Sequence, residues 1–437
     1  MAKKLPISLC FILVITLNAA AYDQIISAKS AVNWNTEAIT SVISLDVEKT
    51  GLKMPTSRNE ALRILNAETP GLLKDTFFSI IIDSSQRLGD AVESGAVSLA
   101  DINEIIDTSK KTPPRFSLDL KQLSTTHTFY LADIGSLFIK HRRANPVEPS
   151  LYTVPTRAYS GILIDARGTL PVHGEYTQEA LSPCIFPRIW GSDMDLLYEK
   201  NTVDPAVALK RGIVYYTASS DESRYRDRIG ADPLRITARG VYGQNRTDPV
   251  ISQTDFLRIV SSPENRNLLR DGKIVILCDQ ETLENSMLGP VRDENYYFTR
   301  QEIEKILAPI PVTRMDVDDS WEGLKISIYD IRFIADSPEI LPEEQERFNI
   351  IADILKIAGP NASFTVKGHT ANVGNPSGEQ TLSELRAEKI AEQLVSRGIP
   401  ADKIQTAGFG ARIPIDTNET ADGRARNRRA EIIIKLN

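Results

Sequence analysis

Hydrophobic positions along the first third of the chain alternate between two patterns. Residues 41–47 mostly alternate between polar and apolar side chains, which is typical of a half-buried strand, whereas residues 58–65 carry apolar side chains at helical spacing. A second helix is predicted at residues 99–106. Residues 22–150 are therefore expected to form an N-terminal α+β domain of unknown role, which ends at the prolines around Pro149.

The next segment has continuous apolar runs at both of its ends. Residues 159–168 and 272–279 are predicted to form buried strands, and a helical run at residues 255–260 lies between them. Because strands and helices alternate, residues 151–290 are expected to form an α/β or α+β middle domain. Residues 291–323 are more polar, with one helical stretch at 300–307, and are expected to form a linker.

The last segment, residues 324–437, has the clearest pattern. A strand is predicted at residues 324–333, and Pro342 begins a helix whose apolar residues share one face. A strand at 363–370, a helix that starts at a capping box, Thr381 to Glu384, and a strand at 430–436 follow. The expected order is β-α-β-α-β, so the whole chain is predicted to be an α+β multidomain protein.

The first residues differ from the rest of the chain. Lys3 and Lys4 precede the apolar run 9–17, and three alanines follow at 19–21. This pattern is typical of a secretory signal peptide at residues 1–21 that is cleaved after Ala21, and the alternative is an uncleaved anchor. The apolar run is too short to cross a bilayer of roughly 30 Å, so no transmembrane segment is expected in the mature chain.

Composition agrees with an exported, water-facing protein. Of 437 residues, 41% are hydrophobic and 25% are charged, and the net charge of −7 gives no indication of nucleic-acid binding. Without the signal peptide, Cys184 and Cys278 are the remaining cysteines, and they form either a disulfide or two buried free thiols. Neither has the spacing of a zinc site, and the chain lacks nucleophile-elbow, phosphate-loop and zinc-protease motifs. We therefore expect no enzyme activity, no cofactor and no metal.

Two resemblances follow from short motifs. Residues 161–168 (Gly-Ile-Leu-Ile-Asp-Ala-Arg-Gly) and Asp232-Pro233-Leu234 loosely resemble bacterial envelope lipoprotein-like domains, in which Asn is usual at the position of Asp232. Within residues 324–437, the matching motifs are Gly368-His369-Thr370, Leu382-Ser383-x-x-Arg386-Ala387, Gly408-Phe409-Gly410 and Gly423-Arg424-x-x-Asn427-Arg428-Arg429. Their order and spacing resemble the OmpA C-terminal family, which associates with peptidoglycan. The resemblance implies a periplasmic envelope protein that is associated with the outer membrane.

The OmpA resemblance also implies a ligand site. Family members bind the free amino-acid end of diaminopimelate, with an Asp directly after Gly-His-Thr for the ammonium and an Arg fifteen residues later for the carboxylate. Here Arg386 keeps the second role, but Ala371 occupies the Asp position. We therefore expect standard peptidoglycan binding to be lost or altered. The positions equivalent to the family site are Thr370, Ala371, Asn372, Glu379, Arg386, Asn427 and Arg428.

Several alternatives remain open at this stage. Glu379 or Asn372 could replace the missing acceptor and keep the domain functional as a wall anchor with Arg386, and the ligand could be another diamino acid such as ornithine. Arg386 could instead have a structural role beside Glu379. The domain could be a scaffold that contacts other envelope proteins, or residues 22–290 could bind a small ligand. The sequence gives no indication of the oligomeric state.

Overall fold

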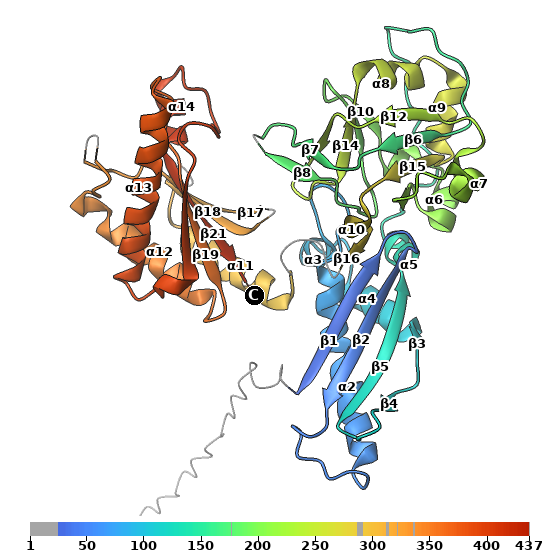
Figure 1. Ribbon diagram of the computed structural model, residues 1–437, viewed down its shortest axis with the longest axis horizontal. Coiled ribbons are helices and arrows are strands. Elements are labelled where there is room, and N and C mark those ends of the chain that lie inside the picture. Colours follow the sequence, from blue (N-terminus) through green and yellow to red (C-terminus); the bar gives the residue numbers. More distant parts are fainter. Residues whose placement is uncertain are drawn as a thin grey trace, which may run out of the picture.

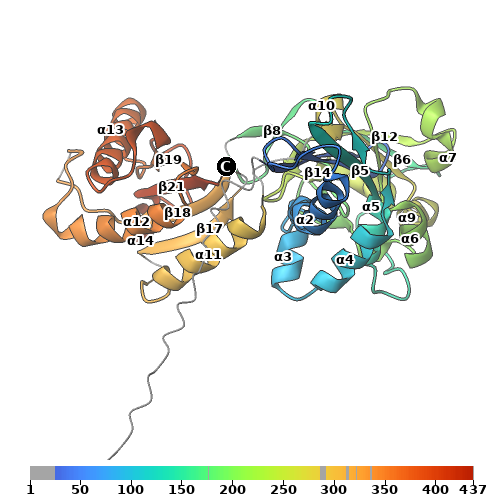
Figure 2. The ribbon, with the colours of Figure 1, turned by 90° about the horizontal axis from the view of Figure 1, so that it is seen from below.

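The computed structural model describes residues 25–175, 177–285, 292–311, 314–320, 322–334 and 337–436. The signal peptide predicted at residues 1–21 lies outside these residues. Three α/β units are visible: a first unit and a middle unit that are stacked end to end, and a C-terminal unit beside them (Figures 1 and 2). No helix in the described ranges is long and apolar enough to cross a membrane.

The first unit is an antiparallel sheet in the order β16-β1-β2-β5-β3, to which β4 adds through β5. Its strands are β1 (Ile26–Asn33), β2 (Ala38–Asp46), β3 (Lys110–Lys111), β4 (Arg115–Phe116), β5 (Gln122–Tyr130) and β16 (Glu284–Asn285). Its helices are α2 (Arg58–Phe78), α3 (Leu88–Glu93), α4 (Leu99–Thr108) and α5 (Leu131–Ser136). Burial alternates along β2, so the strand and the two helices predicted for this region are confirmed.

The middle unit is built on a parallel sheet in the order β11-β15-β6-β12. These strands are β6 (Ile162–Asp165), β11 (Tyr215–Thr217), β12 (Leu234–Thr237) and β15 (Ile274–Leu277). Residues of β15 are buried throughout, because parallel strands in such sheets are covered on both faces, and this explains the continuous apolar runs. The helical elements are η1 (Lys200–Thr202), α6 (Pro205–Arg211), η2 (Glu222–Tyr225), α7 (Arg226–Ile229), α8 (Gln253–Val260), α9 (Pro263–Arg270) and α10 (Gln280–Leu283).

Two smaller sheets complete this unit. The first has the order β10-β9-β14-β13, with β9 (Ile189–Gly191), β10 (Leu196–Tyr198), β13 (Gly240–Tyr242) and β14 (Asp248–Ile251). The second pairs β7 (Thr169–Pro171) with β8 (Gln178–Ala180). The thiols of Cys184 and Cys278 are both free and buried, so of the two alternatives the structure contains the free thiols. Burial raises the pKa of each thiol, which keeps it protonated and unreactive.

The first and middle units share a seam of backbone hydrogen bonds. Phe186 N donates to Ile82 O at 2.8 Å, and Trp34 N donates to Leu283 O at 2.9 Å. A Cβ atom at Gly243 would lie 2.3 Å from Cβ of Ser84, so only glycine permits this approach. The two units are therefore joined closely through main-chain contacts.

The C-terminal unit has the sheet order β17-β18-β21-β19-β20, and α12 and α13 cover one of its faces (Figure 1). Its strands are β17 (Met315–Ser320), β18 (Gly323–Tyr329), β19 (Ser363–Gly368), β20 (Ile404–Gly408) and β21 (Arg429–Lys435). The helical elements are α11 (Glu294–Leu307), η3 (Pro342–Glu344), α12 (Gln345–Ile357), α13 (Pro376–Val395), η4 (Ala401–Lys403) and α14 (Ala421–Asn427). Helix α11 and strand β17 thus occupy the segment that was expected to be a linker.

The start of α13 differs from the sequence prediction. The helix begins at Pro376 with Asn375 as its N-cap, whereas the capping box predicted Thr381 as the N-cap, six residues later. The Asn375 side chain accepts a hydrogen bond from Gly378 N at 3.2 Å, while the Thr381 hydroxyl donates within the helix to Ser377 O. Asn at the N-cap followed by Pro is a favourable helix start, and the helix therefore begins before the capping box at Thr381. Arg386 therefore lies about three turns inside α13.

The structure also adds strand β20 and helix α14 between α13 and the last strand. Strand β20 pairs in parallel with β19, from Phe364 with Ile404 to Gly368 with Gly408. It lies at the sheet edge, and its residues are exposed or half-buried, so it lacks the alternating pattern that marks a strand in sequence.

Candidate ligand site of the C-terminal domain

The equivalent of the family site lies where β19 leaves the sheet against α13. A Cβ atom at Gly368 would be 2.2 Å from Ser383 O, so glycine allows the strand to approach the helix. The Ser383 hydroxyl accepts a hydrogen bond from Gly410 N at 2.8 Å, and Thr370 N donates to Gly410 O at 2.9 Å. These contacts explain why the Gly-His-Thr, Leu-Ser and Gly-Phe-Gly motifs occur together: they fix one junction.

Ala371 is the first residue beyond this junction, and its side chain is buried, with 5% exposure. A methyl group therefore occupies the place at which the OmpA resemblance implies a carboxylate. The preceding residue, Thr370, is also buried, and its hydroxyl has no hydrogen-bond partner among the described residues. The structure thus brings a buried apolar group and an unpaired hydroxyl to the start of the loop.

Glu379 organises the loop that follows Ala371. Its Oε1 atom accepts hydrogen bonds from Val373 N at 2.7 Å and from Asn375 N at 3.3 Å, and the residue is buried, with 6% exposure. Asn372 makes a smaller turn, because its Oδ1 accepts from Gly374 N at 2.9 Å. Oε1 of Glu379 therefore already accepts hydrogen bonds from the protein's own backbone amides.

Asn427 connects the site to the loop before α14. Its Oδ1 accepts from Ile415 N and Asp416 N, and its Nδ2 donates to Asp416 O and to Asn418 Oδ1 at 3.0 Å. Asn418 Oδ1 also accepts from Asn372 N at 3.1 Å. Asn418 thus joins both loops, although the sequence analysis did not identify it. An Asn in a polar stretch that contains Thr and Asp gives only a general turn signal.

Each of the two arginines at predicted positions contacts a residue of the segment that follows β18. Arg386 is half-buried, and its guanidinium stacks over the ring of Phe333 at 4.4 Å, four residues after the end of β18. Seven residues separate it from Glu379, which corresponds to about 10 Å along α13. Arg428 lies 3.7 Å from the Asp330 carboxylate. The structure thus joins Asn372 and Asn427 through Asn418 and places Arg386 beside an aromatic ring, while Glu379 binds backbone amides of the loop after Ala371.

The His369 side chain is packed inside the domain. The ring is 4% exposed, stacks on Phe409 at 5.3 Å, and its Nε2 lies 3.6 Å from Glu431 Oε2. Burial lowers the pKa of His369, so the ring is neutral near pH 7. Burial alone would raise the pKa of Glu431, but the side chains of His369 and Arg429 lower it, and the carboxylate stays charged.

Charged residues of the middle domain close a turn after β6. Arg167 Nε donates to Asp165 Oδ1 at 2.8 Å and Gly168 N donates to Asp279 Oδ2 at 2.8 Å, so these groups close the turn after β6. Within the part of the chain that the structure describes, no group of three or more His, Cys, Asp or Glu side chains is arranged to hold a metal ion.

Parts of this chain are similar to known proteins. Residues 332–428 match the OmpA family, residues 25–137 match the N-terminal domain of Treponema pallidum Tp0624, and residues 161–280 match its second domain. Similar curated proteins include the peptidoglycan-binding protein ArfA of Mycobacterium tuberculosis, with 42% identity over 24% of this chain and 32% of ArfA. The probable lipoprotein YiaD of Escherichia coli is 31% identical over 32% of this chain and 63% of YiaD.

Solved structures give similar partial matches. The cell wall anchor of the Pseudomonas aeruginosa T6SS is 29% identical, and the match covers 31% of this chain and 97% of that one with a TM-score of 0.28. An outer membrane protein of Borrelia burgdorferi is 29% identical over 29% of this chain and 99% of that one, with a TM-score of 0.24. The chain spans about a third of the length of ArfA. Residues 332–428 therefore form a domain of the OmpA family, preceded by two domains that are similar to the N-terminal and second domains of Tp0624.

Proposed function

We propose that this chain is a non-enzymatic envelope protein of the periplasm, associated with the outer membrane, whose C-terminal domain contacts peptidoglycan through an altered site. The OmpA-family match and relatives that are named as peptidoglycan-binding, lipoprotein and outer membrane proteins support this proposal. The signal-peptide pattern of the first 21 residues is consistent with export.

The observation that carries the altered-site proposal is the buried methyl group of Ala371. A diaminopimelate ammonium brought to this position loses its water without meeting a carboxylate, which costs about 2–5 kcal/mol. A loss of about 3 kcal/mol corresponds to a factor of about one hundred in affinity. Free diaminopimelate is therefore expected to bind weakly, even though the chain retains Arg386 at the position of the family arginine.

Glu379 offers the main alternative, a functional wall anchor. Its Oε1 already accepts two backbone amides, so a ligand ammonium would have to be bound by the other carboxylate oxygen. The Glu379 side chain is also buried, with 6% exposure of the residue. These two features favour a loop-forming role for Glu379. A wall peptide with ornithine is a further alternative, and direct titration separates it.

Co-sedimentation of the full chain with purified sacculi tests the proposal. We expect little wild-type protein in the pellet and clearly more of the Ala371→Asp variant, because the new carboxylate would pair with the ligand ammonium. Adding Arg386→Ala to Ala371→Asp should remove this gain. Glu379→Gln, which keeps an acceptor oxygen for the loop, should leave the wild-type result unchanged. Strong wild-type pelleting that Glu379→Gln abolishes would instead support the anchor alternative.

A further inference from the structure

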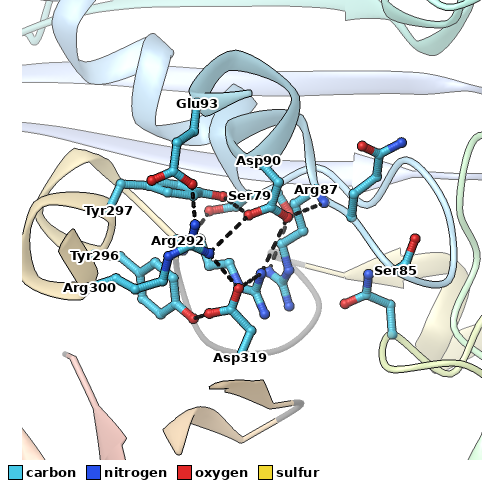
Figure 3. Close-up of polar contacts among 12 residues, drawn as sticks. Ser79, Ser85, Arg87, Asp90, Glu93, Arg292, Tyr296, Tyr297, Arg300 and Asp319 are labelled. Atoms are coloured by element: carbon cyan, nitrogen blue, oxygen red, sulfur yellow. Dashed lines mark hydrogen bonds and ion pairs between the residues drawn. The ribbon is translucent and has the colours of Figure 1, made fainter. Parts of the chain in front are cut away.

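Helix α11 lies between the first domain and the C-terminal domain, and charged side chains gather around it (Figures 2 and 3). We call this group the α11 charge cluster, and it comprises Arg87, Asp90, Glu93, Arg292, Tyr296, Tyr297, Arg300 and Asp319. Three members come from the first domain, four from α11 and the residues before it, and Asp319 comes from the edge strand β17.

Contacts on one side of the cluster reach the first domain. Arg300 forms an ion pair with Glu93, and the Tyr297 hydroxyl donates to Asp90 Oδ1 at 2.9 Å. Arg292 Nη1 lies 3.4 Å from Asp90 Oδ2. A Cβ atom at Gly89 would be 2.4 Å from the Tyr297 ring, so glycine lets this ring lie directly on α3.

Contacts on the other side reach the C-terminal sheet, and the same two arginines make them. Arg300 Nη1 donates to Asp319 Oδ2 at 2.6 Å, and Arg292 Nη1 lies 3.6 Å from the same oxygen. The Tyr296 hydroxyl donates to Asp319 Oδ1. Each arginine therefore pairs at once with a carboxylate of the first domain and with Asp319 (Figure 3).

The cluster is balanced in charge and largely withdrawn from water. It contains three arginines and three carboxylates, and Arg87 and Arg292 are only 1% and 2% exposed. Burial, helped by the nearby Arg292 charge, lowers the pKa of Arg87 to about 10. Buried charges are tolerated only while they are paired, so the removal of one carboxylate disturbs the whole group.

A cleft lies next to the cluster. A space of about 840 Å³ separates the uncovered face of the C-terminal sheet from the β7–β8 region, and Lys367 and Phe409 line one side while Glu175 and Arg246 line the other. Asp319 lies at its edge. The C-terminal sheet and the middle domain are thus separated by open space where the cluster joins the C-terminal and first domains.

We propose that the α11 charge cluster is an interdomain latch. While its pairs are intact, Asp319 holds the C-terminal domain against the first domain. When they are broken, the C-terminal domain separates and moves independently of the two preceding domains, which extends the distance over which its ligand site can reach. The latch itself does not depend on which ligand that site binds.

Small-angle X-ray scattering of the full chain, without the predicted signal peptide, tests the latch. Asp319→Lys should increase the radius of gyration and the maximum dimension, because a cation then faces Arg292 and Arg300. Asp318→Lys is the matched control. This neighbour on β17 has a 60% exposed side chain that is 4.0 Å from Lys325, and wild-type scattering is expected.

Gly89→Ala provides a second route that changes no charge. Its methyl group would meet the Tyr297 ring, so the variant should show the same expansion while circular dichroism retains the wild-type spectrum. This variant keeps the test decisive if Asp319→Lys fails to fold. Folded Gly89→Ala protein with the wild-type radius of gyration, or equal expansion of the Asp318→Lys control, would overturn the proposal. Sacculus binding is not used in this readout, so failure of the latch is distinct from failure of the wall-binding proposal.

Discussion

Two polar regions involve the C-terminal domain, and they differ in how their charged side chains are paired. In the α11 charge cluster, Asp319 meets two arginines that also pair with Asp90 and Glu93. At the ligand site, Ala371 contributes a methyl group, Glu379 is turned to backbone amides, and the Arg386 guanidinium stacks on Phe333.

The charged side chains of the α11 charge cluster pair across domains, whereas Glu379 and the Arg386 guanidinium at the ligand site contact groups of the C-terminal domain itself. Buried ion pairs are retained where both partners are present, because an unpaired charge is costly away from water. The ligand site has no carboxylate at position 371, so this cost does not arise there. Its loop is held by hydrogen bonds from backbone amides to Glu379. We infer that the C-terminal domain keeps the OmpA-family framework while Asp319 serves a contact between domains.

The largest expected effect comes from the removal of a cluster arginine. Arg292→Met should destabilise the protein by about 3–5 kcal/mol, because Asp90 and Asp319 lose a buried partner. Thermal unfolding followed by calorimetry measures the shift. Lys121→Met is the control, because it breaks the exposed pair with Glu48 and should leave the transition unchanged. Equal shifts of the unfolding transition in both variants would contradict the claim that the buried pairs contribute more stability than the exposed pair.

A smaller effect is expected at the ligand-site framework. Asn427→Ala removes four hydrogen bonds of a side chain that is 1% exposed, and it should lower stability by roughly 2–4 kcal/mol. Asn372→Ala, which removes one exposed side-chain bond, should cost less than about 1 kcal/mol. Denaturant unfolding of the C-terminal transition compares them, and a larger loss for Asn372→Ala would contradict the role assigned to Asn427.

The smallest effect is a pH dependence that arises from His369. Because burial lowers its pKa in the folded state, this residue contributes stability above its unfolded pKa of about 6.5, and that contribution is lost as the pH falls through the folded value. His369→Phe keeps a ring against Phe409 but does not titrate. The wild type should therefore lose stability relative to the variant as the pH falls below about 6.5, by about 1.4 kcal/mol for each unit by which the folded pKa lies below the unfolded pKa. Parallel stability curves for the two proteins over this range would contradict this assignment.

Sequence patterns anticipated the ligand-site framework better than the cluster. The Gly-His-Thr and Asn-Arg-Arg motifs marked the junction and Asn427 through their resemblance to a known family, although the contacts there join residues that are 27 and 12 positions apart. The cluster was missed because Asp90 and Arg292 are 202 residues apart in sequence, and no local pattern marks such a pair. Strand β17 was missed for a related reason: its sequence, Met-Asp-Val-Asp-Asp-Ser, is too polar to give a clear apolar alternation.

Glu379 shows a second limit of sequence reasoning. The sequence places a carboxylate where it could replace the missing acid, but only the structure shows that its Oε1 accepts hydrogen bonds from Val373 N and Asn375 N. The position of a charge in the sequence therefore does not determine whether a ligand can use it.

Calorimetric titration of the full chain with free diaminopimelate and with ornithine, in wild-type and Ala371→Asp forms, tests the central claim most directly. We expect weak or undetectable wild-type binding of diaminopimelate and an affinity about one hundredfold higher for Ala371→Asp, equivalent to about 3 kcal/mol. Tight wild-type binding of ornithine alone would identify an altered ligand preference. Wild-type binding of diaminopimelate at the strength of Ala371→Asp would contradict the claim, because the missing carboxylate would then have no effect on recognition.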